Sequence, residues 1–170
     1  MNIKLFGIGL CAALGFISPV QAQPLFTTRI INMNSDAIAQ VTLTRQGMNT
    51  SAGSGYGKEA SAWAVSQIIQ LAVNSQIGEN PNSVASIHQA LKAGQGLPIS
   101  DRSQAIPGDI VIAAQDGHIG ICLNAGCTQV VSNLASEAKF SWLTDADFNA
   151  LSSKGKSEIY RMVDLALLQF

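Results

Sequence analysis

The sequence predicts an α+β domain in which N-terminal helices pack on an antiparallel β-sheet. Between residues 59 and 74 apolar residues recur at the spacing of one helix face. After Gly96 the pattern changes to short β-branched segments that are separated by turn residues. Because helices come first and strands follow, the order favours an α+β fold over a regular alternation of helices and strands.

The helical part of the chain contains three segments. The clearest, Glu59 to Asn74, begins with an acidic residue that suits the positive end of a helix. A second helix follows a cap at Asn82 or Ser83 and stops at Gly94. A short helix over residues 36–43 is also compatible with the sequence. His88 lies in the middle of the second helix, and we assign it no functional role.

The β part contains five predicted strands. They cover residues 109–114, 118–123, 128–132, 140–142 and 159–163. Asn124-Ala-Gly126 provides a tight turn between the second and third strands. We expect residues 145–150 to form a short helical or looped connection. The sheet is therefore expected to be an antiparallel meander.

The start of the chain is typical of an export signal. Lys4 precedes an apolar run from Leu5 to Ile17, and Val20-Gln21-Ala22 has the small residues that a signal peptidase recognises. We therefore divide the chain into a signal peptide over residues 1–22, an N-terminal extension over 23–50 and one domain over 51–170. After removal of the signal no membrane span is expected.

The charge balance argues against some classes of partner. The chain has 10 Lys and Arg residues against 11 Asp and Glu residues, and its net charge is −1. No basic face indicates nucleic-acid binding, and no acidic tail is present in the sequence. We expect no cofactor.

Two cysteines remain after the predicted cleavage, Cys122 and Cys127. They flank the predicted turn, and in an oxidising compartment such a pair closes a disulfide. A zinc site is the competing interpretation, but it needs about four ligands, and only His88 and His118 are available to help. Free thiols are the third possibility. The pair therefore predicts a disulfide and no metal.

The most informative motif is Pro107-Gly-Asp-Ile-Val-Ile, followed by Gly117-His118-Ile-Gly-Ile. It places one histidine on a strand shortly after a Pro-Gly-Asp turn, and Asn133 follows at the end of the next strand. Asp109 is expected to stabilise its turn. The order of these parts resembles the CHAP family, the cysteine- and histidine-dependent amidohydrolases and peptidases, and more broadly the papain-like NlpC-type cell-wall hydrolases.

This resemblance covers residues 55 to 163 and implies a papain-like fold and a role as a peptidoglycan amidase or endopeptidase. It also implies that His118 acts as the base and that Asn133 orients its imidazole ring. The family's nucleophile is a cysteine at the start of the first helix, and this chain has none there. Ser61-Ala-Trp-Ala-Val fits the family pattern Cys-x-Trp-aromatic-Val, with Ser61 at the cysteine position and Ala64 at the aromatic one. An alternative register places the lost cysteine at Ala60.

Because the nucleophile is replaced, the sequence is compatible with two functions, a weak or inactive hydrolase and a non-catalytic binding protein. A serine hydroxyl is far less acidic than a thiol, so a site built for a thiolate–imidazolium pair is expected to be slow or inert with Ser61. The replacement can be natural or engineered. The alternative is a non-catalytic pseudo-enzyme that binds a cell-wall peptide or a protein partner in the same groove. In either case Trp63 and Tyr56 are candidates to line that groove, and the protein is expected in the periplasm or outside the cell.

Overall fold

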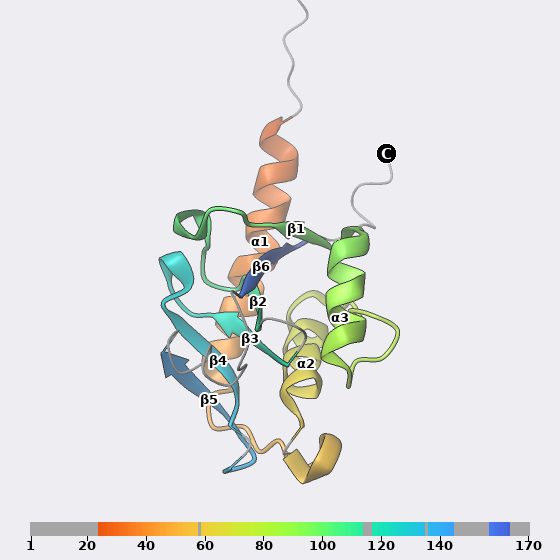
Figure 1. Cartoon of the computed structure of the whole chain (residues 1–170). Coiled ribbons are helices and arrows are strands. Elements are labelled where there is room, and N and C mark those ends of the chain that lie inside the picture. Colours follow the sequence, from red (N-terminus) through yellow and green to blue (C-terminus); the bar gives the residue numbers. More distant parts are fainter. Residues whose placement is uncertain (1–23, 58, 114–116, 135, 145–156, 164–170) are drawn as a thin grey trace, which may run out of the picture.

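A computed structural model describes residues 24–57, 59–113, 117–134, 136–144 and 157–163. The predicted signal peptide and the predicted connection at residues 145–150 lie outside these ranges. Figure 1 shows a helical part beside one twisted sheet. The helices are α1 (Pro24–Thr44), α2 (Ser61–Val73) and α3 (Val84–Ala90), and α3 continues into the π-helical turn η2 (Leu91–Gln95). Short 3₁₀ turns are η1 (Ser54–Gly57), η3 (Arg102–Gln104) and η5 (Ala125–Cys127).

The sheet contains six antiparallel strands among the residues placed, in the order β1-β6-β2-β3-β4-β5. Their bounds are β1 Gly96–Pro98, β2 Ile110–Ala113, β3 His118–Cys122, β4 Gln129–Leu134, β5 Lys139–Thr144 and β6 Glu158–Met162. From β2 to β5 the sheet is the expected meander. However, the last strand, β6, inserts between β1 and β2 instead of extending the edge beside β5. The α+β class is therefore confirmed, and the simple meander is corrected at this strand.

Both faces of the central strands β2 and β3 are buried. Ile110, Ile112, Ile119 and Ile121 lie in the main core together with residues of α2 and α3. Val111, Ala113 and Cys122 point to the opposite face, where they form a smaller cluster with Ala105, Cys127, Val130 and Ile159. Two-sided burial explains why β2 reads as an unbroken apolar run in the sequence.

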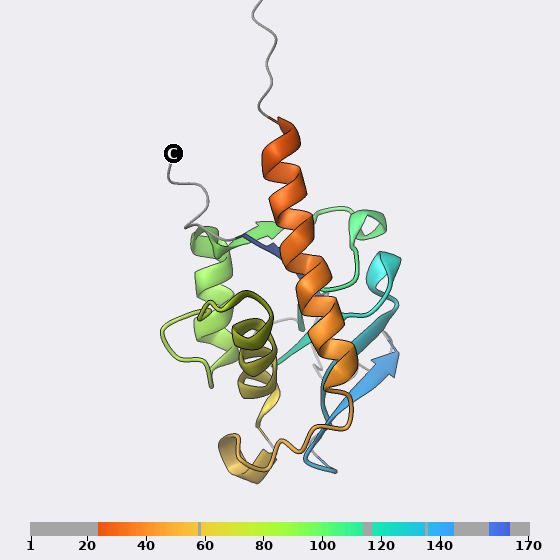
Figure 2. The same cartoon turned by 180° about the vertical axis from the view of Figure 1, so that it is seen from behind.

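Helix α1 is longer than the short helix predicted for residues 36–43 and belongs to the fold. It crosses the helical side of the sheet, as Figure 2 shows from behind, and its first turns extend beyond the body of the domain. Ile38 is completely buried in the main core. The segment expected as an N-terminal extension thus supplies part of the core.

The Pro107-Gly-Asp turn attaches α1 and β6 to β2. Asp109 is fully buried, and its carboxylate accepts two hydrogen bonds from Arg161 on β6, at 2.9 and 2.8 Å. The same carboxylate accepts from the amide of Ile106 at 2.9 Å and from the hydroxyl of Ser35 at 3.3 Å. A Cβ atom on Gly108 would lie 1.9 Å from the carbonyl oxygen of Ser35, so only glycine allows this approach. Asp109 therefore stabilises the turn, as the sequence predicted.

His88 makes polar contacts with two residues of β6 that the sequence did not predict. It is 5% exposed on α3, and its Nε2 atom lies 3.1 Å from the hydroxyl of Tyr160 and 3.3 Å from a carboxylate oxygen of Glu158. The Tyr160 hydroxyl donates to the same carboxylate at 2.6 Å. This cluster joins α3 to β6 and gives His88 a structural role.

Candidate functional site

The N-terminus of α2 carries the position expected for the nucleophile. Ala60 is the N-cap residue, is completely buried and has no side-chain oxygen to accept from the first amides of the helix. Ser61 is the first helical residue and is only 4% exposed. The uncapped amides and the helix dipole give this end a partial positive charge. Such an end suits a developing oxyanion.

A glycine-containing loop covers this helix start. A Cβ atom on Gly53 would lie 2.6 Å from the Cβ of Ala60 and 3.3 Å from that of Trp63, so the loop backbone packs directly on the first turn of α2. Trp63 is half-buried and packs against the main core. Trp63 therefore lies beside the helix start, partly in the core and partly accessible.

Tyr56 lies in the same loop but is directed to solvent. It is 88% exposed and has a φ of 54°, in the left-handed region that residues other than glycine seldom adopt. Its neighbour Gly57 is buried, and a Cβ there would lie 2.6 Å from the Cβ of Ala138. The loop thus holds its backbone against the protein and presents the aromatic ring outward.

His118 is half-buried at the first position of β3. Its Nε2 atom lies 3.2 Å from the main-chain carbonyl oxygen of Asn133 on β4. Because a carbonyl only accepts, this contact requires a proton on Nε2.

The pKa of His118 is lowered from 6.5, mainly because burial disfavours the charged imidazolium. Hydrogen bonds to the main chain of Asn133 and Gly117 raise the pKa in part. The balance favours a neutral ring at neutral pH. A neutral imidazole is the form that can act as a base.

The side chain of Asn133 does not make the contact that the sequence analysis assigned to it. Its amide nitrogen donates to the carbonyl oxygen of Gly57 at 2.5 Å, and its amide oxygen accepts from the hydroxyl of Thr50. All three residues are buried. The structure therefore brings Asn133 to His118 through the main chain, and it uses the side chain to attach the loop before α2 to β4.

Strand register explains this division. Gly120 on β3 lies opposite Ser132 on β4, so Asn133 continues the register opposite Ile119. Ile119 belongs to the core face that α2 covers, and residues opposite each other share a face. The side chain of Asn133 consequently points toward the helical layer, whereas His118 starts from the other face. A carbonyl oxygen in the plane of the sheet remains within reach of the ring.

A path of contacts therefore connects the two halves of the candidate site. It runs from His118 to Asn133, then to Gly57, four residues before Ser61. Helix α2 itself packs against β3 and β4. Thr50 and Gly57 were missed by the sequence analysis, and no local pattern marks them, because their role depends on a strand that is distant in sequence.

The two cysteines form a disulfide, Cys122–Cys127, and both are buried. The bridge closes the β3–β4 connection, where η5 replaces the expected tight turn. Arg102 supports this connection, since its guanidinium donates to the carbonyl oxygens of Gly126 (2.9 Å) and Cys127. Consequently, the part of the chain that the structure describes offers no free thiol.

Neither a metal site nor a membrane span is found in the residues that the structure describes. Among them, no group of three His, Cys, Asp or Glu side chains is placed to hold a metal ion. None of the helices within the described ranges has the length and apolar character needed to cross a membrane. Comparison with known proteins identified no family: no protein-family model, no curated protein and no solved structure matches this chain.

Proposed function

We propose that this protein is an exported relative of the peptidoglycan amidases and endopeptidases, with Ser61 at the position of their nucleophile and with weak or absent hydrolytic activity. The observation that carries the proposal is the setting of His118. Its half-buried ring has a lowered pKa that favours the neutral form near pH 7, is bound through Nε2 to β4, and belongs to a strand whose other face is covered by the uncapped α2. A base, a hydroxyl and an oxyanion-stabilising helix end are the parts of an acyl-transfer site.

The roles of the residues follow from their chemistry. His118 starts from the sheet face opposite α2, so its ring would have to turn around the start of β3 to accept the proton of the Ser61 hydroxyl. The first amides of α2 would stabilise the oxyanion on the attacked carbonyl. Trp63 and the exposed Tyr56 would contact the cell-wall peptide. Ser61 would be a poor nucleophile in this arrangement, because its hydroxyl ionises far less readily than a thiol beside the same imidazole.

A second function is supported by the state of the cysteines. Cys122 and Cys127 are joined in a disulfide, so neither can replace the missing nucleophile. With Ser61 only 4% exposed, a groove that binds a cell-wall peptide or a protein partner without cleaving it accounts for the same residues. The disulfide and the N-terminal apolar run both favour the periplasm or the exterior as the location.

The test is release of muropeptides from purified peptidoglycan by the unmodified chain and by Ser61→Cys, Ala60→Cys and His118→Ala. Release by the unmodified chain that is lost in His118→Ala would establish a serine enzyme. Release only by Ser61→Cys or only by Ala60→Cys would establish a disarmed hydrolase and fix the register. The matched control is Ser100→Cys, which adds a thiol at an exposed serine outside the site.

The binding function has its own readout in the same experiment. Co-sedimentation with peptidoglycan by a chain that releases nothing in any form would favour the binding module, and Tyr56→Ala should then weaken co-sedimentation. Neither release nor co-sedimentation by any form would contradict both proposals.

A further inference from the structure

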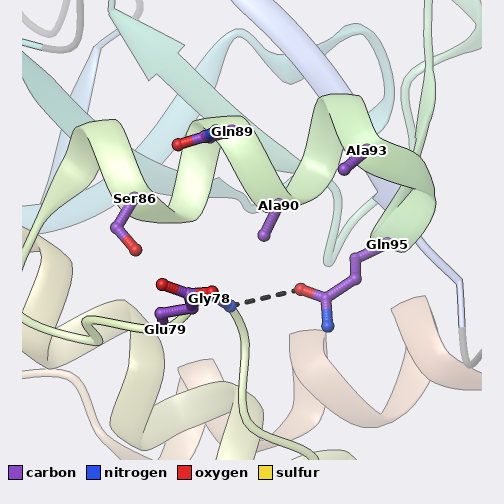
Figure 3. Close-up of a pocket in the computed structure, with 7 residues that line it drawn as sticks. All are labelled: Gly78, Glu79, Ser86, Gln89, Ala90, Ala93 and Gln95. Carbon is purple, nitrogen blue, oxygen red and sulfur yellow. Dashed lines mark hydrogen bonds between the residues drawn. The ribbon is translucent and has the colours of Figure 1, made fainter.

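A pocket of about 450 Å³ opens between α3 and the segment that joins α2 to α3. Its lining consists of small and polar residues: Gly78, Glu79, Ser86, Gln89, Ala90, Ala93 and Gln95. In Figure 3, Ser86 and Ala90 project from α3 toward residues 78 and 79, and Gln95 closes one end. The volume falls within the range of small-molecule sites. None of these residues belongs to the candidate site at Ser61 and His118.

The walls of the pocket are fixed by hydrogen bonds. The side-chain oxygen of Gln95 accepts from the amide of Gly78 at 3.2 Å, and the hydroxyl of Ser86 accepts from the amide of Asn80 at 3.0 Å. Gly78 has a φ of 69°, and a Cβ there would lie 3.0 Å from the carbonyl oxygen of Ser86. Two backbone segments are thus held together around the opening, so a ligand would meet a formed site.

A π-helical turn forms part of this wall. Ala93 and Gln95 lie in η2, where Gly94 has a φ of 113°. Ala90 and Ala93 each contribute only a methyl group to the lining, so a ligand can approach the helix backbone closely at this wall.

The polar groups define the chemistry of an occupant. Glu79 is the only charged residue of the lining, and it is exposed. The other polar side chains are the hydroxyl of Ser86 and the carboxamides of Gln89 and Gln95. Lys92, on the same π-helical turn, forms an ion pair with Glu158 at 3.7 Å. The pocket therefore combines one negative charge with neutral donors and acceptors.

We propose that this pocket binds a small ligand that carries a primary ammonium group beside hydroxyl or amide groups. The ammonium group would lie at Glu79, and the neutral groups would hydrogen-bond to Ser86, Gln89 and Gln95. The amine of a diamino acid and that of an amino sugar share this chemistry. The proposal is independent of hydrolysis at Ser61, since the pocket and the candidate site share no residue.

The experiment is an NMR titration of the ¹⁵N-labelled full chain with two pairs of compounds. Each pair contains a charged amine and its neutral acetylated form: Nα-acetyl-lysine amide with its diacetyl form, and glucosamine with N-acetylglucosamine. We expect saturable shifts of the amides of Gly78, Glu79 and Ala90 with the charged member of at least one pair and weaker binding of its neutral partner. The pair that responds identifies the source of the amine.

Variants locate the site. Glu79→Gln should weaken binding of the charged compound about fivefold, as expected for an exposed ion pair. Ala90→Leu should abolish the shifts, because the larger side chain fills the pocket. Asp36→Asn makes the same charge change on the exposed side of α1 and should leave binding unchanged. The proposal is overturned if neither charged compound gives saturable shifts, if neutral and charged forms bind equally, or if Asp36→Asn weakens binding as much as Glu79→Gln.

Discussion

Two buried polar centres hold this sheet, and they differ in charge. At the Pro107-Gly-Asp turn, the carboxylate of Asp109 accepts two hydrogen bonds from Arg161 and joins α1, β2 and β6. At the other centre the groups are neutral: Asn133 joins Thr50, Gly57 and the ring of His118. The first centre fixes the framework with a buried ion pair. The second binds the ring of His118 to a neutral carbonyl, and burial lowers the pKa of this histidine.

The difference shows that the same sheet holds a charged pair that stabilises the fold and a histidine that can exchange a proton. The ion pair raises the pKa of Arg161 through its hydrogen bonds to Asp109 and keeps the guanidinium charged. A charge placed as close to His118 would fix the protonation state of the imidazole, and the ring would lose its capacity to exchange a proton near neutral pH.

The largest effect is expected at the charged centre. Asp109→Ala leaves the guanidinium of Arg161 without its carboxylate and removes the acceptor of the Ile106 amide, so unfolding free energy should fall by about 3–5 kcal/mol. Denaturant unfolding measures the loss. The control is Asp101→Ala, which removes an exposed carboxylate that caps η3 through the amide of Ser103 and should lower the unfolding free energy much less than Asp109→Ala does. Equal losses in the two variants would contradict the role of Asp109.

At the neutral centre, Asn133→Ala should lower the unfolding free energy by about 2–3 kcal/mol, because it leaves the Thr50 hydroxyl and the Gly57 carbonyl buried without this partner. The same variant keeps the main-chain carbonyl that binds His118. An NMR titration should therefore give an unchanged pKa for His118. If the side chain of Asn133 oriented the His118 ring, the pKa would shift in this variant. Ser132→Ala, which removes one buried hydrogen bond to the Ile119 carbonyl, is the matched control at about 1 kcal/mol.

Loss of the Cys122–Cys127 bridge should have a moderate effect. The loop that it closes is short, with a sequence separation of 5, and the chain-entropy model then gives about 2 kcal/mol. Reduction of the intact chain, followed by denaturant unfolding, measures it, and the variant with serine at both positions should unfold like the reduced chain. A loss as large as that of Asp109→Ala would contradict this order and show that the bridge stabilises the fold as much as the ion pair does.

The smallest expected effect is a pH dependence that comes from His118. Its pKa in the folded protein lies below 6.5, so the unfolded chain binds the proton more tightly. Stability should be complete above that pH and should fall as the pH decreases from about 6.5 to the folded pKa. His118→Gln should abolish this slope while the dependence at lower pH, from carboxylates such as Glu158, persists. A slope of the same size in His118→Gln would exclude His118 as its origin.

Much of the secondary structure was determined by local sequence. The apolar spacing after Glu59 predicted α2 to within two residues, and Ser83 caps α3 as expected, with its hydroxyl accepting from the amide of Ser86. The β-branched segments predicted the cores of five strands. These predictions succeed because helix periodicity, capping and strand alternation are properties of neighbouring residues.

Tertiary structure decided the contacts on which the candidate site depends. The insertion of β6 beside β2 placed Arg161 on Asp109, and no local pattern encodes that pairing. The register of β4 against β3 directed the side chain of Asn133 to Gly57 and its carbonyl to His118, since a shift of one residue exchanges the faces of a strand. The sequence by itself determined which residues are available at the site, but the pairing of distant strands determined which of their atoms meet.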